Sequence, residues 1–187
     1  MDDYTIPASF EAFPKMARLN RDCIITEKID GTNAQICITG DGGMQVGSRT
    51  RWLDAQNDNM GFYAWAMRNR DELMKLGPGR HFGEWWGSKI QRGYGLAAGD
   101  KRFSLFNTSR WNAENIPACC SVVPELYKRT FSTEAVMVAL DILHREGSHA
   151  APGYMKPEGI VVFHVAANQA FKVTIEHDEV PKGLVRA

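Results

Sequence analysis

The sequence predicts an α+β domain in which strands dominate and two helices cover a sheet. Short runs of strand-forming residues end at glycine-containing turns, which is typical of strands. Two longer segments repeat apolar residues at helical spacing. The 187 residues show no internal repeat, low-complexity tract or change of composition, so we expect one domain over residues 1–187.

The strands follow one another with turns between them. Residues 23–28 and 32–39 flank an Asp-Gly pair, which predicts a hairpin, and glycines at 40–43 lead into a third strand over 44–49. In residues 170–176, Phe171 and Val173 point one way while Lys172 points the other, so Lys172 faces solvent or a cleft. The other predicted strands are residues 81–86, 102–107, 121–123 and 159–165.

Two segments have helical periodicity. Apolar residues recur at helical spacing over 60–76, until the Gly-Pro-Gly sequence at 77–79 stops the pattern. Ser132 or Thr133 can cap a second helix, whose apolar residues share one face and which ends at Gly147. Both helices are expected to cover a sheet.

Composition limits the classes of function. Lysine plus arginine equal aspartate plus glutamate at 22 each, so the chain lacks the overall basic field of a nonspecific nucleic-acid binder. Any nucleic-acid contact must be local. There is no apolar run of membrane-spanning length, and the acidic N-terminus does not resemble a signal peptide, so we expect a cytoplasmic protein without membrane contact.

The cysteines favour a reduced state. Two of them lie in apolar strand-like runs, where they act as small hydrophobic residues. Cys119 and Cys120 with His144 or His149 form an alternative zinc site, but adjacent cysteines match the usual ligand spacing poorly. The four cysteines are Cys23, Cys37, Cys119 and Cys120.

Five charged motifs provide the chemistry. The first places Lys28 at the mouth of the Asp-Gly turn, where an unprotonated amine can attack the α-phosphate of a nucleotide. Taken alone, this motif is also compatible with a turn that has no chemistry. The motifs are Glu27-Lys28-Ile29-Asp30-Gly31-Thr32-Asn33, Gly47-Ser48-Arg49-Thr50-Arg51, Phe82-Gly83-Glu84-Trp85-Trp86-Gly87, Pro157-Glu158-Gly159-Ile160-Val161-Val162-Phe163 and Phe171-Lys172-Val173-Thr174.

In this order the motifs resemble those of phage-type ATP-dependent RNA ligases, which belong to the covalent nucleotidyltransferase superfamily of ligases and capping enzymes. The resemblance covers residues from about 24 to 175. It implies an antiparallel, sheet-rich α+β nucleotidyltransferase (adenylation) domain that uses ATP and Mg²⁺. Its substrates would be RNA ends, with DNA ends as the alternative. A separate end-healing kinase or phosphatase could prepare the ends, and the oligomeric state is left open.

The resemblance also implies a role for each matched residue. Lys28 takes AMP, Lys172 contacts the α-phosphate, and Glu158 contributes to magnesium binding. Glu84 would accept a hydrogen bond from a ribose hydroxyl, and Phe106 would stack on the purine. A guanidinium at position 49 can grip phosphate oxygens or a nucleic-acid end. The implied nucleotide-binding residues are Glu27, Asp30, Gly31, Asn33, Arg49, Glu84 and Phe106.

The sequence departs from the family pattern in three places. Asn107 stands where aspartate is expected, and Lys172 is a single lysine where relatives often carry two, with Thr174 as a neutral substitute. Only thirteen residues follow Thr174, so we expect no appended OB-fold. A basic loop then becomes a candidate for backbone contact, although a solvated charged loop is the alternative. This loop carries Lys89, Arg92, Tyr94, Lys101 and Arg102.

The predicted function is a ligase that works in three steps. Lys28 takes AMP from ATP, the AMP passes to a 5′-phosphate end, and a 3′-hydroxyl displaces it. The alternatives are a DNA ligase or a capping-type nucleotidyltransferase, and a nucleic-acid-binding or regulatory module that keeps the fold without turnover. The missing lysine and the missing appendage favour the module.

Overall fold

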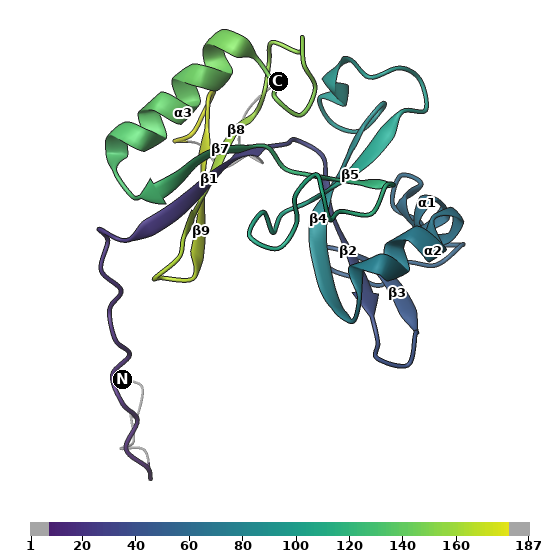
Figure 1. Ribbon diagram of the computed structural model, residues 1–187, viewed down its shortest axis with the longest axis horizontal. Coiled ribbons are helices and arrows are strands. Elements are labelled where there is room, and N and C mark those ends of the chain that lie inside the picture. The colour runs from purple at the N-terminus through teal and green to yellow at the C-terminus, as the bar shows by residue number, and fades with distance from the viewer. Residues whose placement is uncertain (1–7, 180–187) are drawn as a thin grey trace, which may run out of the picture.

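The computed structural model describes residues 8–179, which form two sheets with helices on their outer faces (Figure 1). The acidic N-terminus and residues 180–187 lie outside the described part. The first sheet is entirely antiparallel and is covered by α3 (Thr133–Glu146). Its order is β7 (Glu125–Thr130), β1 (Asp22–Lys28), β8 (Gly159–His164) and β9 (Gln169–Thr174).

The second sheet has five strands and is antiparallel except for its last pair, β5 and β6. One face is covered by α1 (Phe62–Arg68), α2 (Arg70–Leu73) and the 3₁₀ turn η1 (Met74–Leu76). The predicted α+β, antiparallel fold class is therefore confirmed. The strand order is β3 (Met44–Ser48), β2 (Thr32–Ile38), β4 (Gly79–Gly87), β5 (Lys101–Leu105) and β6 (Cys120–Val122).

The predicted hairpin between β1 and β2 is wrong. β1 pairs with β7 and β8, whereas β2 pairs with β3 and β4 in the other sheet. Asp30 and Gly31 thus carry the chain from one sheet to the other. Their backbone N–H groups donate to the Tyr94 hydroxyl and to a Glu84 carboxylate oxygen, so they make no ladder hydrogen bonds there.

The predicted helix over residues 60–76 is three short pieces. Asn69 has φ −105° and ψ 18°, which breaks the helix between α1 and α2. The buried side chains Phe62 and Leu73 keep both pieces on the sheet, so the periodicity identified the buried face correctly. The second predicted helix is confirmed: Ser132 caps α3 by accepting a hydrogen bond from the Ala135 N–H, and Gly147 ends it.

Two strand predictions need correction. The strand predicted over 102–107 ends at Leu105, so Phe106 and Asn107 lie beyond it. Strand β7 was not predicted, because its exposed residues hide the period-2 pattern. In β9, Val173 packs with the α3 cluster as expected, while Phe171 on the same face is exposed.

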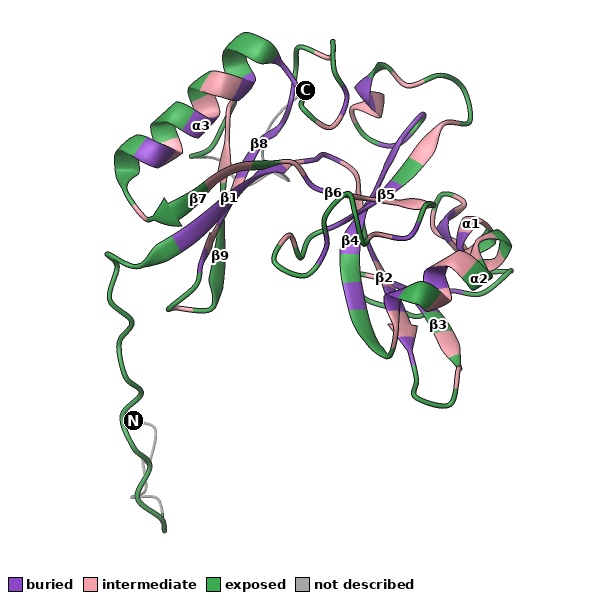
Figure 2. Ribbon diagram, viewed as in Figure 1, coloured by how far each residue is buried: buried purple, intermediate pink, exposed green. Residues whose placement is uncertain are grey.

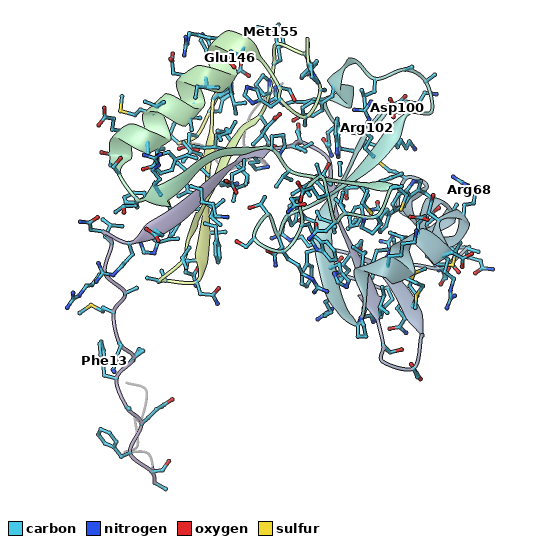
Figure 3. All side chains as sticks on the ribbon, in the orientation of Figure 1. Phe13, Arg68, Asp100, Arg102, Glu146 and Met155 are labelled. Atoms are coloured by element: carbon cyan, nitrogen blue, oxygen red, sulfur yellow. The ribbon has the colours of Figure 1, made fainter. Side chains whose placement is uncertain are left out.

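Residues 8–21, which precede β1, form an extended arm that leaves the first sheet (Figure 1). Phe13 stands clear of the rest of the molecule on this arm (Figure 3). Within residues 8–179, every helix is too short or too polar to cross a membrane.

Candidate active site

Lys28 ends β1 at the junction of the two sheets. Its Nζ donates to Oε2 of Glu158 at 2.6 Å, and Glu158 lies immediately before β8. The pairing of β1 with β8 sets this contact, because Lys28 and Gly159 are register partners. The Lys28 side chain is 23% exposed, so the amine is held by a carboxylate and remains accessible.

Glu84 of β4 supplies the second carboxylate. It also connects β4 to the crossing segment, the Asp30-Gly31 pair that runs between the two sheets. It accepts from the Gly31 N–H at 3.1 Å and from the Asn33 side-chain amide at 3.0 Å. Burial raises the pKa of Glu84 to about 7, against the opposing effects of the Lys28 ammonium and the Gly31 N–H. The nearby charge of Glu158 adds to the rise. Lys28 of β1, Glu84 of β4 and Glu158 before β8 therefore lie close together, and Asn33 of β2 joins them through Glu84.

The raised pKa of Glu84 predicts a pH-dependent stability. The folded protein holds this proton more tightly than the unfolded chain, whose ordinary pKa is 4.5. The resulting stabilisation is complete below pH 4.5 and is lost as the pH rises through about 7. Between these values, the unfolding free energy of wild type should fall by about 3 kcal/mol relative to Glu84→Gln. Denaturant titrations at several pH values measure this, and parallel curves for the two proteins would contradict it.

Gly31 lies so close to β4 that a side chain does not fit. A Cβ atom there would be 2.5 Å from the Trp85 carbonyl oxygen and 2.7 Å from the Trp86 Cβ. We expect Gly31→Ala to destabilise the protein by about 1–3 kcal/mol and to weaken nucleotide attachment, because it pushes Lys28 away from Glu84. Denaturant unfolding measures the first effect. Gly40→Ala is the matched control, since a Cβ at Gly40 meets nothing within 4 Å.

Arg92 and Tyr94 organise the crossing segment, although the sequence pointed to neither as a partner of this turn. Arg92 Nε donates to Oδ2 of Asp30 at 3.2 Å, and the buried Tyr94 hydroxyl accepts from the Asp30 N–H at 2.8 Å. Lys101, predicted to lie in the same basic loop, is instead the first residue of β5, and its Nζ donates to the Met60 carbonyl oxygen. At least part of this loop is thus structural. Arg92 and Tyr94 lie more than 60 residues from Asp30 in the sequence, so no local sequence pattern indicates that they contact it.

Glu27 is buried beside the nucleophile and binds the loop after α3. Its carboxylate accepts from the Ser148 hydroxyl at 2.6 Å and from the N–H groups of His149 and Ala150 at 2.9 Å each. Burial raises the pKa of Glu27, and these three donors oppose the rise. The predicted nucleotide contact of Glu27 stays a prediction, and the structure adds an anchoring role that the sequence did not reveal.

Lys172 and Thr174 lie on the same sheet face as Lys28. Thr174 is in register with Gly159, the partner of Lys28, while Lys172 is in register with Val161, one pleat further along. The Thr174 hydroxyl and N–H both donate to Asp178. Lys172 is exposed and faces away from the α3 side of the sheet, as its alternation predicted.

Arg49 and Phe106 lie at the edges of the site. Arg49 is exposed after Ser48, which pairs with Ala34, so it lies at the Asn33 end of β2. Phe106 follows β5 and is 42% exposed. Asn107, where aspartate was expected, accepts from the Arg110 N–H and acts as a turn residue. The contacts predicted for Arg49 and Phe106 remain predictions.

Glu158 and Glu84 could bind a divalent metal ion only if waters or substrate phosphates supplied its remaining ligands. Mg²⁺ commonly binds one or two carboxylates plus substrate phosphates and waters. Residues 8–179 contain no group of three or more His, Cys, Asp or Glu side chains placed to hold a metal by themselves. This also contradicts the alternative zinc site at Cys119 and Cys120. All four cysteines are free thiols.

The comparisons with known proteins agree with this fold. A family model described as RNA ligase matches residues 21–174. The chain belongs to this RNA ligase family, which confirms the resemblance of its motifs. A search of curated proteins finds no match.

Among the solved structures that match are several forms of the Naegleria gruberi RNA ligase. A glutamate-to-alanine variant solved with ATP and Mn has a TM-score of 0.62 at 18% identity, covering 84% of this chain and 51% of that one. A lysine-to-alanine variant with ATP and Mn has a TM-score of 0.61 at 19% identity, covering 83% and 49%. The form with PPi has a TM-score of 0.60 at 20% identity, covering 83% and 50%. This likeness concerns the fold, and the chain spans about half the length of these structures.

Proposed function

We propose that this protein is an ATP-dependent RNA ligase whose residues 1–187 form a single nucleotidyltransferase domain. In this proposal Lys28 becomes covalently attached to AMP. The observation that carries it is the meeting of Lys28 with Glu158 and Glu84, three residues from separate motifs, at the junction of the two sheets. Family membership and the likeness to an RNA ligase solved with ATP and Mn support the choice of reaction and nucleotide.

In the first step Lys28 Nζ attacks the α-phosphorus of ATP. A P–N bond forms, the bond to the bridging oxygen breaks, and pyrophosphate leaves with its electron pair. The amine must first lose a proton, and Glu158 Oε2 is a carboxylate acceptor within hydrogen-bond distance. A divalent cation at Glu158 and Glu84 would offset the phosphate charge. Lys172 and Arg49 supply fixed positive charge on the two sides of the site.

The second step takes place at the AMP phosphorus and the third at the phosphorus of the RNA 5′-phosphate. The 5′-phosphate oxygen of an RNA end attacks the AMP phosphorus and Lys28 leaves as an amine. A 3′-hydroxyl then attacks the 5′-phosphorus and AMP leaves, so that a phosphodiester forms. In this proposal Glu84 and Asn33 hold the ribose of AMP through both steps. The support is that the Asn33 amide donates to the Glu84 carboxylate, and that Lys28 is close enough to Glu84 to oppose its raised pKa.

The test is incubation with ATP labelled at the α-phosphate plus magnesium, followed by denaturing electrophoresis, with labelled GTP in a parallel lane. We expect protein-bound label from ATP. Label from GTP alone would support a capping-type enzyme, and joining of DNA but not RNA ends would support a DNA ligase. No label from either nucleotide, with prior adenylylation excluded by mass, would support a binding module without turnover.

A further inference from the structure

Three large aromatic side chains are exposed at the five-stranded sheet, on the face opposite α1. Trp52 is 46% exposed, Phe82 50% and Phe106 42%. The first half of β4 alternates between exposed and buried bands, as Figure 2 shows, and the rest is buried. Phe82 and Glu84 share a face, while Trp85 on the other face packs beneath α1. Phe82 belongs to a strand with neighbours on both sides, where an exposed aromatic ring is not needed for packing.

The strand register places these rings in one row across the sheet. The Phe106 N–H donates to the Phe82 carbonyl oxygen, Phe82 pairs with Gln35, and Gln35 pairs with Gly47. Trp52 lies over Gly47, where a Cβ atom would come within 3.1 Å of the Trp52 ring. The missing side chain at Gly47 therefore makes room for the indole on this face.

Arg80 adds a positive charge to the row. Its guanidinium lies 5.6 Å from the Trp52 ring centroid and 5.6 Å from the Phe82 ring centroid. Its Nη2 donates to the Gln35 side chain at 3.0 Å, which fixes the planar group between the two rings. We call Trp52, Arg80 and Phe82 the aromatic row.

The aromatic row is continuous with the candidate nucleotide site. Phe82 and Gln35 are each two residues from Glu84 and Asn33 on the same strands, so the two sets are one pleat period apart, about 7 Å. Phe106, the expected platform for the purine, lies beside Phe82 on the β5 side, where its N–H donates to the Phe82 carbonyl oxygen. A nucleotide next to the AMP would thus meet Phe82.

We propose that the aromatic row is a subsite for an extended single strand of nucleic acid, with bases stacked on Phe82 and Trp52 and a backbone phosphate on Arg80. The inference rests on the proposed function and specifies where the polynucleotide binds. Aromatic faces beside a cation are the combination that single-stranded nucleic acid uses, because stacking accepts any base while the cation binds phosphate. The chain as a whole carries no net charge, so binding depends on such local groups.

The test measures binding and chemistry separately. A fluorescein-labelled, 5′-phosphorylated oligoribonucleotide is titrated with the full chain, without ATP, and followed by anisotropy. We expect Phe82→Ala to weaken binding roughly 5- to 150-fold, the loss of one stacked base. Arg80→Gln should lower the slope of log K against log salt by about 0.7. Met137→Ala, at an exposed apolar position on α3, is the matched control and should bind as wild type does.

Attachment of AMP from labelled ATP is the second readout, and Phe82→Ala should keep it, because this step needs no polynucleotide. Weakened oligonucleotide binding in Phe82→Ala supports the subsite. It does so even if neither wild type nor variant takes label from ATP, and that result would contradict the proposed function but not the subsite. Unchanged binding in Phe82→Ala and Arg80→Gln overturns the subsite. So does a wild type that takes label and binds no oligonucleotide, which would leave the row as a docking face for protein. Phe82→Leu, which keeps apolar bulk without a ring, should bind as weakly as Phe82→Ala, and binding restored by leucine also overturns stacking.

Discussion

Lys28→Arg is expected to lose protein-bound AMP by about three orders of magnitude or more while the fold survives. Arginine keeps the positive charge that faces Glu158, so the buried carboxylate is not left alone. A guanidinium stays protonated in proteins and cannot attack phosphorus. The substitution therefore removes the nucleophile with little change in charge.

The measurement is label retained after denaturing electrophoresis, together with an unfolding curve for each protein. Lys75→Arg is the matched control, because Lys75 is an exposed lysine on η1 that pairs with Glu72 at 2.5 Å. It should take label as wild type does. Label retained in Lys28→Arg would place the attachment on another residue and end the proposed role of Lys28.

Glu158→Gln is expected to lower the rate of AMP attachment by about 100-fold or more and to raise the magnesium concentration needed for half-maximal rate. Glutamine is nearly the same size, but it neither accepts a proton from Lys28 nor binds a cation through a charged oxygen. The 2.6 Å contact between Lys28 and Glu158 is also the closest charge contact of the nucleophile among the described residues. Both consequences follow from the loss of one negative charge.

Two patterns of result separate the roles of Glu158. A lower rate with the same magnesium dependence would remove Glu158 from the metal and leave it as a partner of Lys28 alone. An unchanged or faster rate would mean that the ion pair only restrains the lysine. Glu125→Gln, at a half-exposed position paired with Lys128 at 3.9 Å, controls for a change of net charge.

The sequence predicted the elements better than their pairing. Helix α3 has a cap, a periodic face and a final glycine within sixteen residues, so local signals suffice. The Asp30-Gly31 turn shows the opposite case. An Asp-Gly pair between apolar runs is the usual hairpin signal, yet both edges of β1 are taken by β7 and β8, more than 100 residues further along.

In the candidate site, too, residues in local motifs could be predicted and residues that act through long-range contacts could not. Lys28, Glu84 and Glu158 could be named because each lies in a motif with its own local pattern. The sequence indicates Arg92 and Tyr94 only as members of a basic loop and does not indicate Ser148, because they act through single contacts with Asp30 and Glu27 that only the folded chain makes. Anchoring residues of this kind carry no motif, and a lone arginine or serine in a loop reads as solvated surface.

The placement of β1 also has a consequence for the order in which the chain becomes an enzyme during synthesis. Strands β2 to β6 lie between residues 32 and 122 and pair only with one another, so this sheet can assemble while the ribosome is still at work. β1 is synthesised first, but its partners β7 and β8 come much later in the chain. Cys23, for example, pairs with Arg129 and His164. Closing so long a loop is slow. We therefore expect the nucleophile to be the last part of the site to mature, so that a nascent or truncated chain stays inert toward ATP.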